Sequence, residues 1–157
     1  MVNKVELMDK ELFSRKSLPH GRPGWVKDDA IFFITVCCRD RGKNQLCHDD
    51  IAEKIFESVR FRHENGDWFV HLFVLMPDHV HGLISFPVER PMKSTVAKWK
   101  EYAAKQIGIL WQRDFFDHRL RTDESYTEKA AYIRMNPVRK GLVGQPEAWK
   151  YVWECVG

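Results

Sequence analysis

Two histidines separated by one residue are the first feature of this sequence that could do chemistry. His79 and His81 lie on either side of Val80 in the segment MPDHVHG, residues 76–82. On a β-strand the side chains of residues i and i+2 leave the same face, so both imidazoles would point one way and Val80 would point into a core. Two imidazoles placed in this manner can hold one divalent metal ion. By itself the pattern favours an ordinary surface or hydrogen-bonded pair, because histidine is common in half-buried polar surroundings.

The residues around this pair argue against three other histidine chemistries. A histidine-triad nucleotide hydrolase needs a third histidine two residues further on, but that position is Leu83. A metallo-β-lactamase pattern continues with an Asp-His pair, whereas Gly82, Leu83 and Ile84 follow in this chain. A helical metalloprotease spaces its two histidines four residues apart, whereas His79 and His81 are two residues apart. All three enzyme classes are therefore disfavoured.

A tyrosine and an asparagine further along the chain form the second candidate set. Tyr132 and Asn136 are four residues apart in YIRMNP, residues 132–137, and would share one face of a helix. A phenol beside a metal-bound phosphate can act as a nucleophile, and an amide oxygen can be a ligand of a hard divalent ion. The alternative is structural: a buried tyrosine with its hydroxyl hydrogen-bonded, and an asparagine that caps the helix before Pro137. The histidine pair is what favours the chemical interpretation.

The predicted strands and helices follow one another in the order of a small α+β sandwich. Strands are predicted at 30–38, 68–75 and 79–86, a further strand or bent connection at 109–121, and helices at about 49–65, 91–108 and 123–136. The second and third strands are joined by a short turn, so they should be antiparallel neighbours. We therefore expect a ferredoxin-like split βαβ sandwich, with an antiparallel sheet and helices packed on one face.

Length and composition agree with one globular domain. The chain has 157 residues, of which 44% are hydrophobic, 13% aromatic and 30% charged, and its mean hydropathy is −0.45. No apolar stretch reaches the ~20 residues of a membrane helix, and the first ten residues hold no signal-peptide core. Secreted, collagen-like, disordered and membrane-spanning classes are disfavoured, and a cytoplasmic location is expected.

The charge distribution and the cysteines exclude fewer classes of function than the length and composition do. The net charge is only +3, but residues 89–140 carry twelve Lys or Arg against seven Asp or Glu. Such a basic segment suits a phosphate backbone, and it equally suits a solvated helix face. The cysteines, Cys37, Cys38, Cys47 and Cys155, lack the C-x-x-C spacing of a zinc or redox site and are predicted to be structural thiols.

Three motifs taken together resemble the REP-associated tyrosine transposases, which belong with the single-tyrosine insertion-sequence transposases of the HUH (His-hydrophobic-His) type. The motifs are MPDHVHG at 76–82, WQR at 111–113 and YIRMNPVRKGLV at 132–143. Each is short, but their order and spacing are specific, and the resemblance extends from the lead-in at 22–25 to the tail at 149–153. It implies a single transposase-like domain over 1–157, with an N-terminal arm at 1–25, a catalytic core at 26–143 and a C-terminal tail at 144–157.

The resemblance implies an enzyme that nicks single-stranded DNA and transfers the strand, through a 5′-phosphotyrosine intermediate. His79 and His81 match the pair that holds a catalytic Mg²⁺ or Mn²⁺. Tyr132 matches the nucleophile, and Asn136 lies where related enzymes place a third metal ligand. Tyr126 is the competing tyrosine, but it lies six residues earlier and off the face that Tyr132 and Asn136 would share.

The implied partner is single-stranded DNA with imperfect-palindrome hairpins, bound by a monomer or a homodimer away from any membrane. The candidate DNA contacts are Lys98, Lys105, Trp111, Gln112, Arg113, Arg119, Arg121, Arg134 and Arg139. Phe115 and Phe116 could stack on unpaired bases, with core packing as the alternative for this aromatic cluster. Two other functions stay open: a DNA-hairpin-binding protein that no longer transposes, and a metal-dependent phosphodiesterase that uses water as its nucleophile.

Overall fold

The computed structural model describes residues 30–121 and 125–155, so the predicted arm at 1–25 lies outside the described residues. In chain order the elements are β1 (Phe32–Cys37), α3 (Asp49–Glu64), β2 (Phe69–Met76), β3 (His79–Ser85), α4 (Met92–Gln106), β4 (Phe116–Arg119), α5 (Tyr126–Arg134), α6 (Asn136–Arg139), a 3₁₀ turn (Pro146–Ala148) and β5 (Val152–Glu154). Among these helices none is long and apolar enough to cross a membrane.

The five strands form one antiparallel sheet in the order β4-β1-β3-β2-β5. The first four strands have the 4-1-3-2 order of a split βαβ sandwich, and β5 is added beside β2. The predicted fold class is confirmed. The strand or bent connection predicted at 109–121 reduces to the short edge strand β4, whose residues are all exposed.

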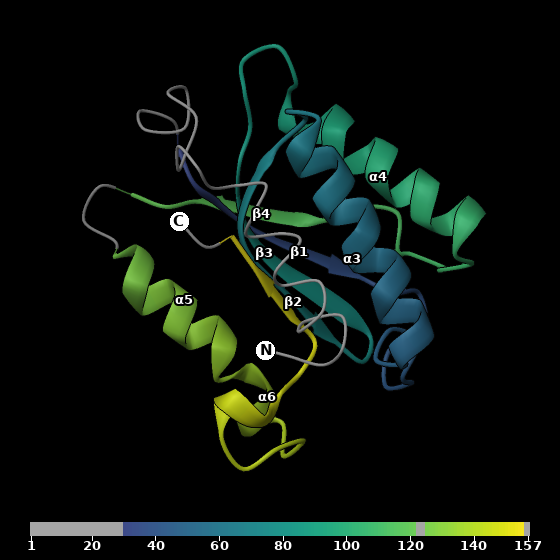
Figure 1. Ribbon diagram of the computed structural model, residues 1–157, viewed down its shortest axis with the longest axis vertical. Helices are drawn as coiled ribbons and strands as arrows, with labels where there is room; N and C mark the ends of the chain where they lie inside the picture. The colour runs from purple at the N-terminus through teal and green to yellow at the C-terminus, as the bar shows by residue number, and fades with distance from the viewer. Residues whose placement is uncertain (1–29, 122–124, 156–157) are drawn as a thin grey trace.

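Helices α3 and α4 cover one face of the sheet and form the larger core with it (Figure 1). Helical spacing predicts the apolar faces of these two helices, and Ile55, Phe56 and Trp99 are almost completely buried. Trp99 also ties the two helices together, because its indole N–H donates a hydrogen bond of 2.9 Å to the hydroxyl of Ser58. The two helices therefore form one layer, which packs on a single face of the sheet.

Helix α5 packs on the opposite face of the sheet, which corrects the expectation that the helices share one face (Figure 1). Ala130 and Ile133 of α5 form a second apolar cluster with Leu72, Val74 and Leu83 of the sheet. The strand pair β2–β3 shifts register between residues 70 and 72, and this irregularity breaks the two-residue alternation of β2. Leu72 consequently belongs to the α5 cluster, whereas an uninterrupted alternation would have placed it with residue 70 on the other face.

The predicted helix at 123–136 is divided in two. Helix α5 ends at Arg134, Met135 caps it, and Asn136 begins the one-turn helix α6 instead of ending the longer helix. The cause is Pro137, which has no N–H to donate and which is tolerated in the first turn of a new helix. Asn136 therefore does not serve as the terminal cap that the structural alternative required.

The cysteines are free thiols, and Cys38 is completely buried beside the sheet. Burial is the main reason why the pKa of Cys38 is raised to about 12, with Asp78 nearby adding to the effect. A thiol in this state is protonated and unreactive, as expected of a packing residue.

Acid should destabilise the fold through His63 of α3. Its Nδ1 accepts a hydrogen bond of 3.0 Å from the Val70 N–H, and burial lowers the pKa of His63 from 6.5 to about 4. Between these two pH values the unfolded chain binds a proton that the folded chain does not, so stability falls as the pH falls. We expect roughly 2–3 kcal/mol of stability to be lost through this residue between pH 7 and pH 4.

The measurement is urea unfolding of wild type and His63→Gln across this pH range, because a glutamine can accept the same bond but does not titrate. The difference in unfolding free energy between the two proteins should shrink as the pH falls. His48→Gln, at an exposed histidine before α3, is the matched control and should follow the wild-type curve. If the unfolding free energies of wild type and His63→Gln changed with pH in parallel, His63 would not be the cause of the loss of stability in acid.

Candidate active site

The histidine pair lies on β3, the central strand of the sheet, on the face that α5 covers. His79 and His81 are on β3, and their ring centroids are 4.7 Å apart with the ring planes at 78°. Val80 between them is 1% exposed and belongs to the opposite core, as the alternation predicts. The two imidazoles therefore lie side by side on one face, at the end of β3 next to the β2–β3 turn.

Each imidazole is oriented by a hydrogen bond at its Nδ1. His79 Nδ1 lies 2.8 Å from Asp78 Oδ1, and His81 Nδ1 lies 3.0 Å from Thr35 Oγ1 on the neighbouring strand. Among the described residues, none forms a hydrogen bond with the Nε2 of either ring. When Nδ1 carries the proton, Nε2 keeps its lone pair, and a metal-binding histidine is commonly held through its other nitrogen in this way.

Asp78 is itself held by the loop after β1. Its Oδ2 accepts hydrogen bonds of 2.9 Å from Arg41 Nε and 2.7 Å from the Gly42 N–H. Burial alone would raise the pKa of Asp78, but the bonds from Gly42, His79 and Arg41 together hold this pKa well below its usual range. The carboxylate is therefore ionised and can keep the Nδ1 proton on His79.

Both histidines are neutral in this environment. Burial is the main cause that lowers the pKa of His81, to about 3, with the charges of His79, Arg139 and Arg41 acting in the same direction. Burial also lowers the pKa of His79, partly offset by Asp78. Neutral imidazole is the form that binds metal ions, because protonation removes the lone pair.

Tyr132 lies on α5 with its side chain 54% exposed. A short chain of contacts links it to the histidine face: the Phe33 ring is 5.2 Å from the His81 ring, and Lys129 Nζ lies 5.3 Å from the Phe33 ring and 5.6 Å from the Tyr132 ring. The other aromatic contact of Tyr132 is with Arg139, whose guanidinium carbon is 4.1 Å from the ring centroid. The phenol-bearing helix α5 therefore packs on the same sheet face as the histidine pair.

Asn136 is buried at the start of α6, and its Oδ1 accepts a hydrogen bond of 3.1 Å from Arg139. An amide oxygen has two lone pairs, so this bond leaves one available for a second partner. Within 30–121 and 125–155, no group of three His, Cys, Asp or Glu side chains is placed to hold a metal ion. The metal-binding side chains that this sheet face offers are the two oriented imidazoles, and Asn136 stays the third ligand that the sequence predicts.

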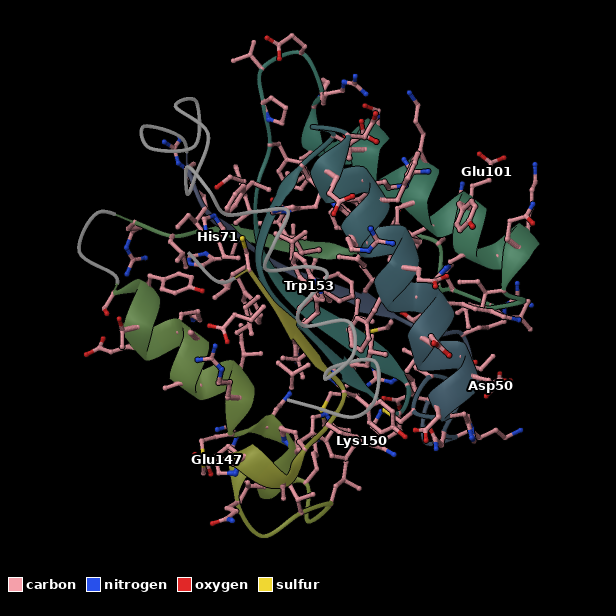
Figure 2. The ribbon with its side chains drawn as sticks, viewed as in Figure 1. Asp50, His71, Glu101, Glu147, Lys150 and Trp153 are labelled. Atoms are coloured by element: carbon pink, nitrogen blue, oxygen red, sulfur yellow. The ribbon has the colours of Figure 1, made fainter. Side chains whose placement is uncertain are left out.

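The predicted DNA contacts are divided between two faces of the molecule. Lys98 and Lys105 lie on α4, on the side of the sheet opposite α5. Lys105 forms an ion pair of 3.0 Å with Glu101 there. Figure 2 shows Glu101 on the side of the sheet opposite α5. These two lysines are therefore not brought to the histidine face, because the helical period places them on the outer surface of α4.

Two further predicted contacts have structural partners. The Trp111 ring packs 5.4 Å from Trp99, and its indole N–H donates a hydrogen bond of 3.2 Å to the Lys100 carbonyl. The alternative of core packing therefore describes Trp111 better than base stacking. Arg134 forms an ion pair with Glu154 of β5 and joins α5 to the edge of the sheet.

The remaining predicted contacts gather near the β1–β4 edge. A cleft of about 480 Å³ is lined by Thr35 and Cys37 of β1 and by residues 112–116, which lead into β4. Thr35 is the residue that orients His81, so this cleft adjoins the histidine pair. Gln112 and Arg113 are exposed there, and Phe116 is 75% exposed, whereas Phe115 packs against the core. Arg119 and Arg121 follow on β4 and directly after it, and both are exposed.

The comparisons with known proteins agree with this geometry. The model of the family described as IS200-like transposase matches residues 30–135, so the chain belongs to the IS200-like transposase family. The REP-associated tyrosine transposase of Escherichia coli K12 is 27% identical over 123 residues, which cover 76% of this chain and 73% of that protein. An uncharacterised protein of Haemophilus influenzae Rd is 23% identical over 153 residues, covering 71% and 82% of the two chains.

A solved structure, a REP-associated tyrosine transposase bound to a REP hairpin, has the same fold. It superposes with a TM-score of 0.69 at 22% sequence identity and covers 86% of this chain and 82% of that one. The family resemblance drawn from the sequence is therefore confirmed.

Sequence reasoning misses the residues that orient the site. The sequence indicates Asp78 only as a residue of the turn, although its position next to His79 could have suggested a bond between the two side chains. Arg41, Thr35 and Lys129 give no signal, because their partners are distant along the chain and are reached only through strand pairing and helix packing.

Replacing Asp78 should remove the hydrogen bond that fixes the orientation and the tautomer of the His79 ring. We expect Asp78→Asn to shift part of the His79 population to the other tautomer, visible by ¹⁵N NMR of the metal-free protein. We also expect the affinity for Mn²⁺ to fall about 10–100-fold, as is typical when a partner of a metal-binding histidine is removed. Asp50→Asn, at an exposed aspartate on α3, is the control and should change neither quantity. Unchanged Mn²⁺ affinity with an altered tautomer would show that His79 does not bind the metal.

Proposed function

We propose that this protein is a metal-dependent single-stranded DNA transposase that cuts and rejoins DNA through a 5′-phosphotyrosine at Tyr132. The observation that carries the proposal is the placement of the phenol-bearing helix α5 on the same sheet face as two neutral, oriented imidazoles. Membership of the IS200-like transposase family supports it independently. An exposed tyrosine suits this role, because the nucleophile must reach a DNA phosphate from solvent.

The site residues divide the chemistry between them. His79, His81 and the amide oxygen of Asn136 would hold Mg²⁺ or Mn²⁺, which when bound neutralises charge on a non-bridging oxygen of the scissile phosphate. Tyr132 attacks the phosphorus in line: its oxygen loses its proton to solvent and forms the new P–O bond. The bond to the 3′ oxygen breaks, and that oxygen takes a proton from solvent to become a 3′-hydroxyl. The 3′-hydroxyl of another strand reverses these steps and rejoins the DNA, so no nucleotide cofactor is needed.

The proposed substrate is single-stranded DNA next to an imperfect-palindrome hairpin. The solved relative is bound to a REP hairpin, which supports a ligand of the same chemical class for this chain. The cleft beside Thr35 offers Gln112 and Arg113 for phosphate or base contacts and the exposed Phe116 ring for stacking. Arg119 and Arg121 would extend this surface along β4.

A covalent-adduct experiment tests the proposed chemistry. Wild type, mixed with Mn²⁺ and a labelled single-stranded oligonucleotide that carries a hairpin, should give a protein–DNA adduct on a denaturing gel. Tyr132→Phe should abolish the adduct, because a phenylalanine has no nucleophilic oxygen. Tyr126→Phe is the matched control on the same helix and should retain it. The double variant His79→Ala with His81→Ala should give no adduct, whether or not Mn²⁺ is present.

The other outcomes separate the rival functions. Cleavage that survives Tyr132→Phe would overturn the transferase and identify a phosphodiesterase that uses water. Hairpin binding by wild type without cleavage, under all metal conditions, would identify a DNA-binding protein that has lost the reaction.

Phe116 should contribute to single-stranded DNA binding. Its ring is exposed at the cleft next to the site, and stacking of one base on an aromatic side chain is worth about 1–3 kcal/mol. We therefore expect Phe116→Ala to weaken the binding of single-stranded DNA by roughly fivefold or more, measured by fluorescence anisotropy. Phe61→Ala is the control, because Phe61 is also well exposed but lies on α3 behind the sheet. Equal affinities for wild type and Phe116→Ala would remove this ring from the interface.

A further inference from the structure

Arg139 is connected to both functional residues of the C-terminal helices. Its guanidinium carbon lies 4.1 Å from the centroid of the Tyr132 ring. One terminal nitrogen, Nη2, donates a hydrogen bond of 2.7 Å to the Tyr132 carbonyl and another of 3.1 Å to Asn136 Oδ1. A single side chain therefore contacts the ring of the proposed nucleophile, the backbone beside it and the amide of the proposed third ligand.

These contacts cross the break between α5 and α6. Tyr132 lies on α5, whereas Asn136 and Arg139 lie on α6, and only Met135 separates the two helices. The continuous α-helical ladder is lost at this point, so the relative orientation of the two helices needs other contacts to fix it. Arg139 supplies such contacts, because its bonds to Tyr132 and Asn136 are made from one rigid planar group.

We propose that Arg139 is a positioning residue, which holds the Tyr132 ring and turns the Asn136 oxygen toward the metal site. This inference rests on the proposed function of Tyr132 and Asn136, but it assigns Arg139 a role other than the phosphate contact expected from its charge. The guanidinium carbon lies over the Tyr132 ring, and Nη2 donates two hydrogen bonds, so the side chain is organised around protein groups.

The contacts of Arg139 with the Tyr132 ring, the Tyr132 carbonyl and Asn136 form a clamp. The chemistry of this clamp requires an arginine. Stacking on an aromatic ring uses the flat face of the guanidinium, while its N–H groups donate in the plane at the same time. A lysine ammonium carries the same charge but cannot present a flat face and a planar set of donors together. Arg139→Lys should therefore keep a charge-based phosphate contact and lose the clamp, and this difference separates the two roles.

The reaction should respond through its rate rather than through DNA affinity. For Arg139→Gln and Arg139→Lys we expect the single-turnover rate of adduct formation to fall about 10–100-fold, because small misplacements of reacting groups have effects of this size. The dissociation constant for hairpin DNA, and its dependence on salt, should stay within about twofold of wild type, since no phosphate contact is removed. Lys105→Gln, which removes an exposed cation behind the sheet, is the control and should leave both quantities unchanged.

A measurement without DNA tests the clamp itself. In the NMR spectrum of the free protein, the Tyr132 ring protons and the Asn136 side-chain amide should both shift in Arg139→Gln and in Arg139→Lys, and neither should shift in Lys105→Gln. Thermal unfolding of both Arg139 variants verifies that they are folded. If Arg139→Gln unfolds, Arg139→Lys provides the same comparison.

The outcomes distinguish this inference from the proposed function. If wild type forms no adduct, the proposed function fails, and the NMR shifts still report whether the clamp exists. If wild type forms the adduct and Arg139→Lys reacts at the wild-type rate while Arg139→Gln binds DNA weakly with a reduced salt dependence, Arg139 is a phosphate contact and the inference is wrong. Unchanged rates in both variants, or unshifted Tyr132 and Asn136 resonances, would also overturn it.

Discussion

The two-residue period of strand β3 is the constraint on which the site depends. His79 and His81 face α5, while Val80 between them is packed into the core under α3 and α4. Neighbouring strands pair with β3 on both sides, so turning the imidazoles away would also pull Val80 out of that core. The position of the histidine pair is thus enforced by apolar packing on the opposite face of the same sheet.

Apolar contacts place the elements of the site, and polar contacts orient its side chains. Ala130 and Ile133 hold α5 against the sheet, and the irregularity in β2 provides Leu72 for them to contact. The orientation of each functional group then comes from a different contact: the carboxylate of the preceding residue for His79, the neighbouring strand for His81, and Arg139 of α6 for the Tyr132 ring.

Burial gives the histidine pair its chemical state. Two imidazoles 4.7 Å apart would repel each other if both were protonated, and the nearby cations Arg41 and Arg139 would add to that repulsion. Desolvation makes the neutral form more favourable, and Asp78 fixes the proton of one ring on Nδ1. Neutral rings with directed lone pairs are the form of histidine that can bind a cation, as the proposed function requires.

The sequence by itself determined the three strands β1, β2 and β3, the helices α3 and α4, the fold class and the shared face of the histidine pair, because strand alternation and helical spacing are local properties of the chain. It also indicated the family, through motifs of specific order and spacing. Only the tertiary structure decided that α5 covers the opposite face from α3 and α4, that Lys98 and Lys105 lie away from the site, and which residues orient each ring. These features arise from contacts between residues far apart in the chain, such as Thr35 with His81, which depend on strand register and helix packing rather than on any local pattern.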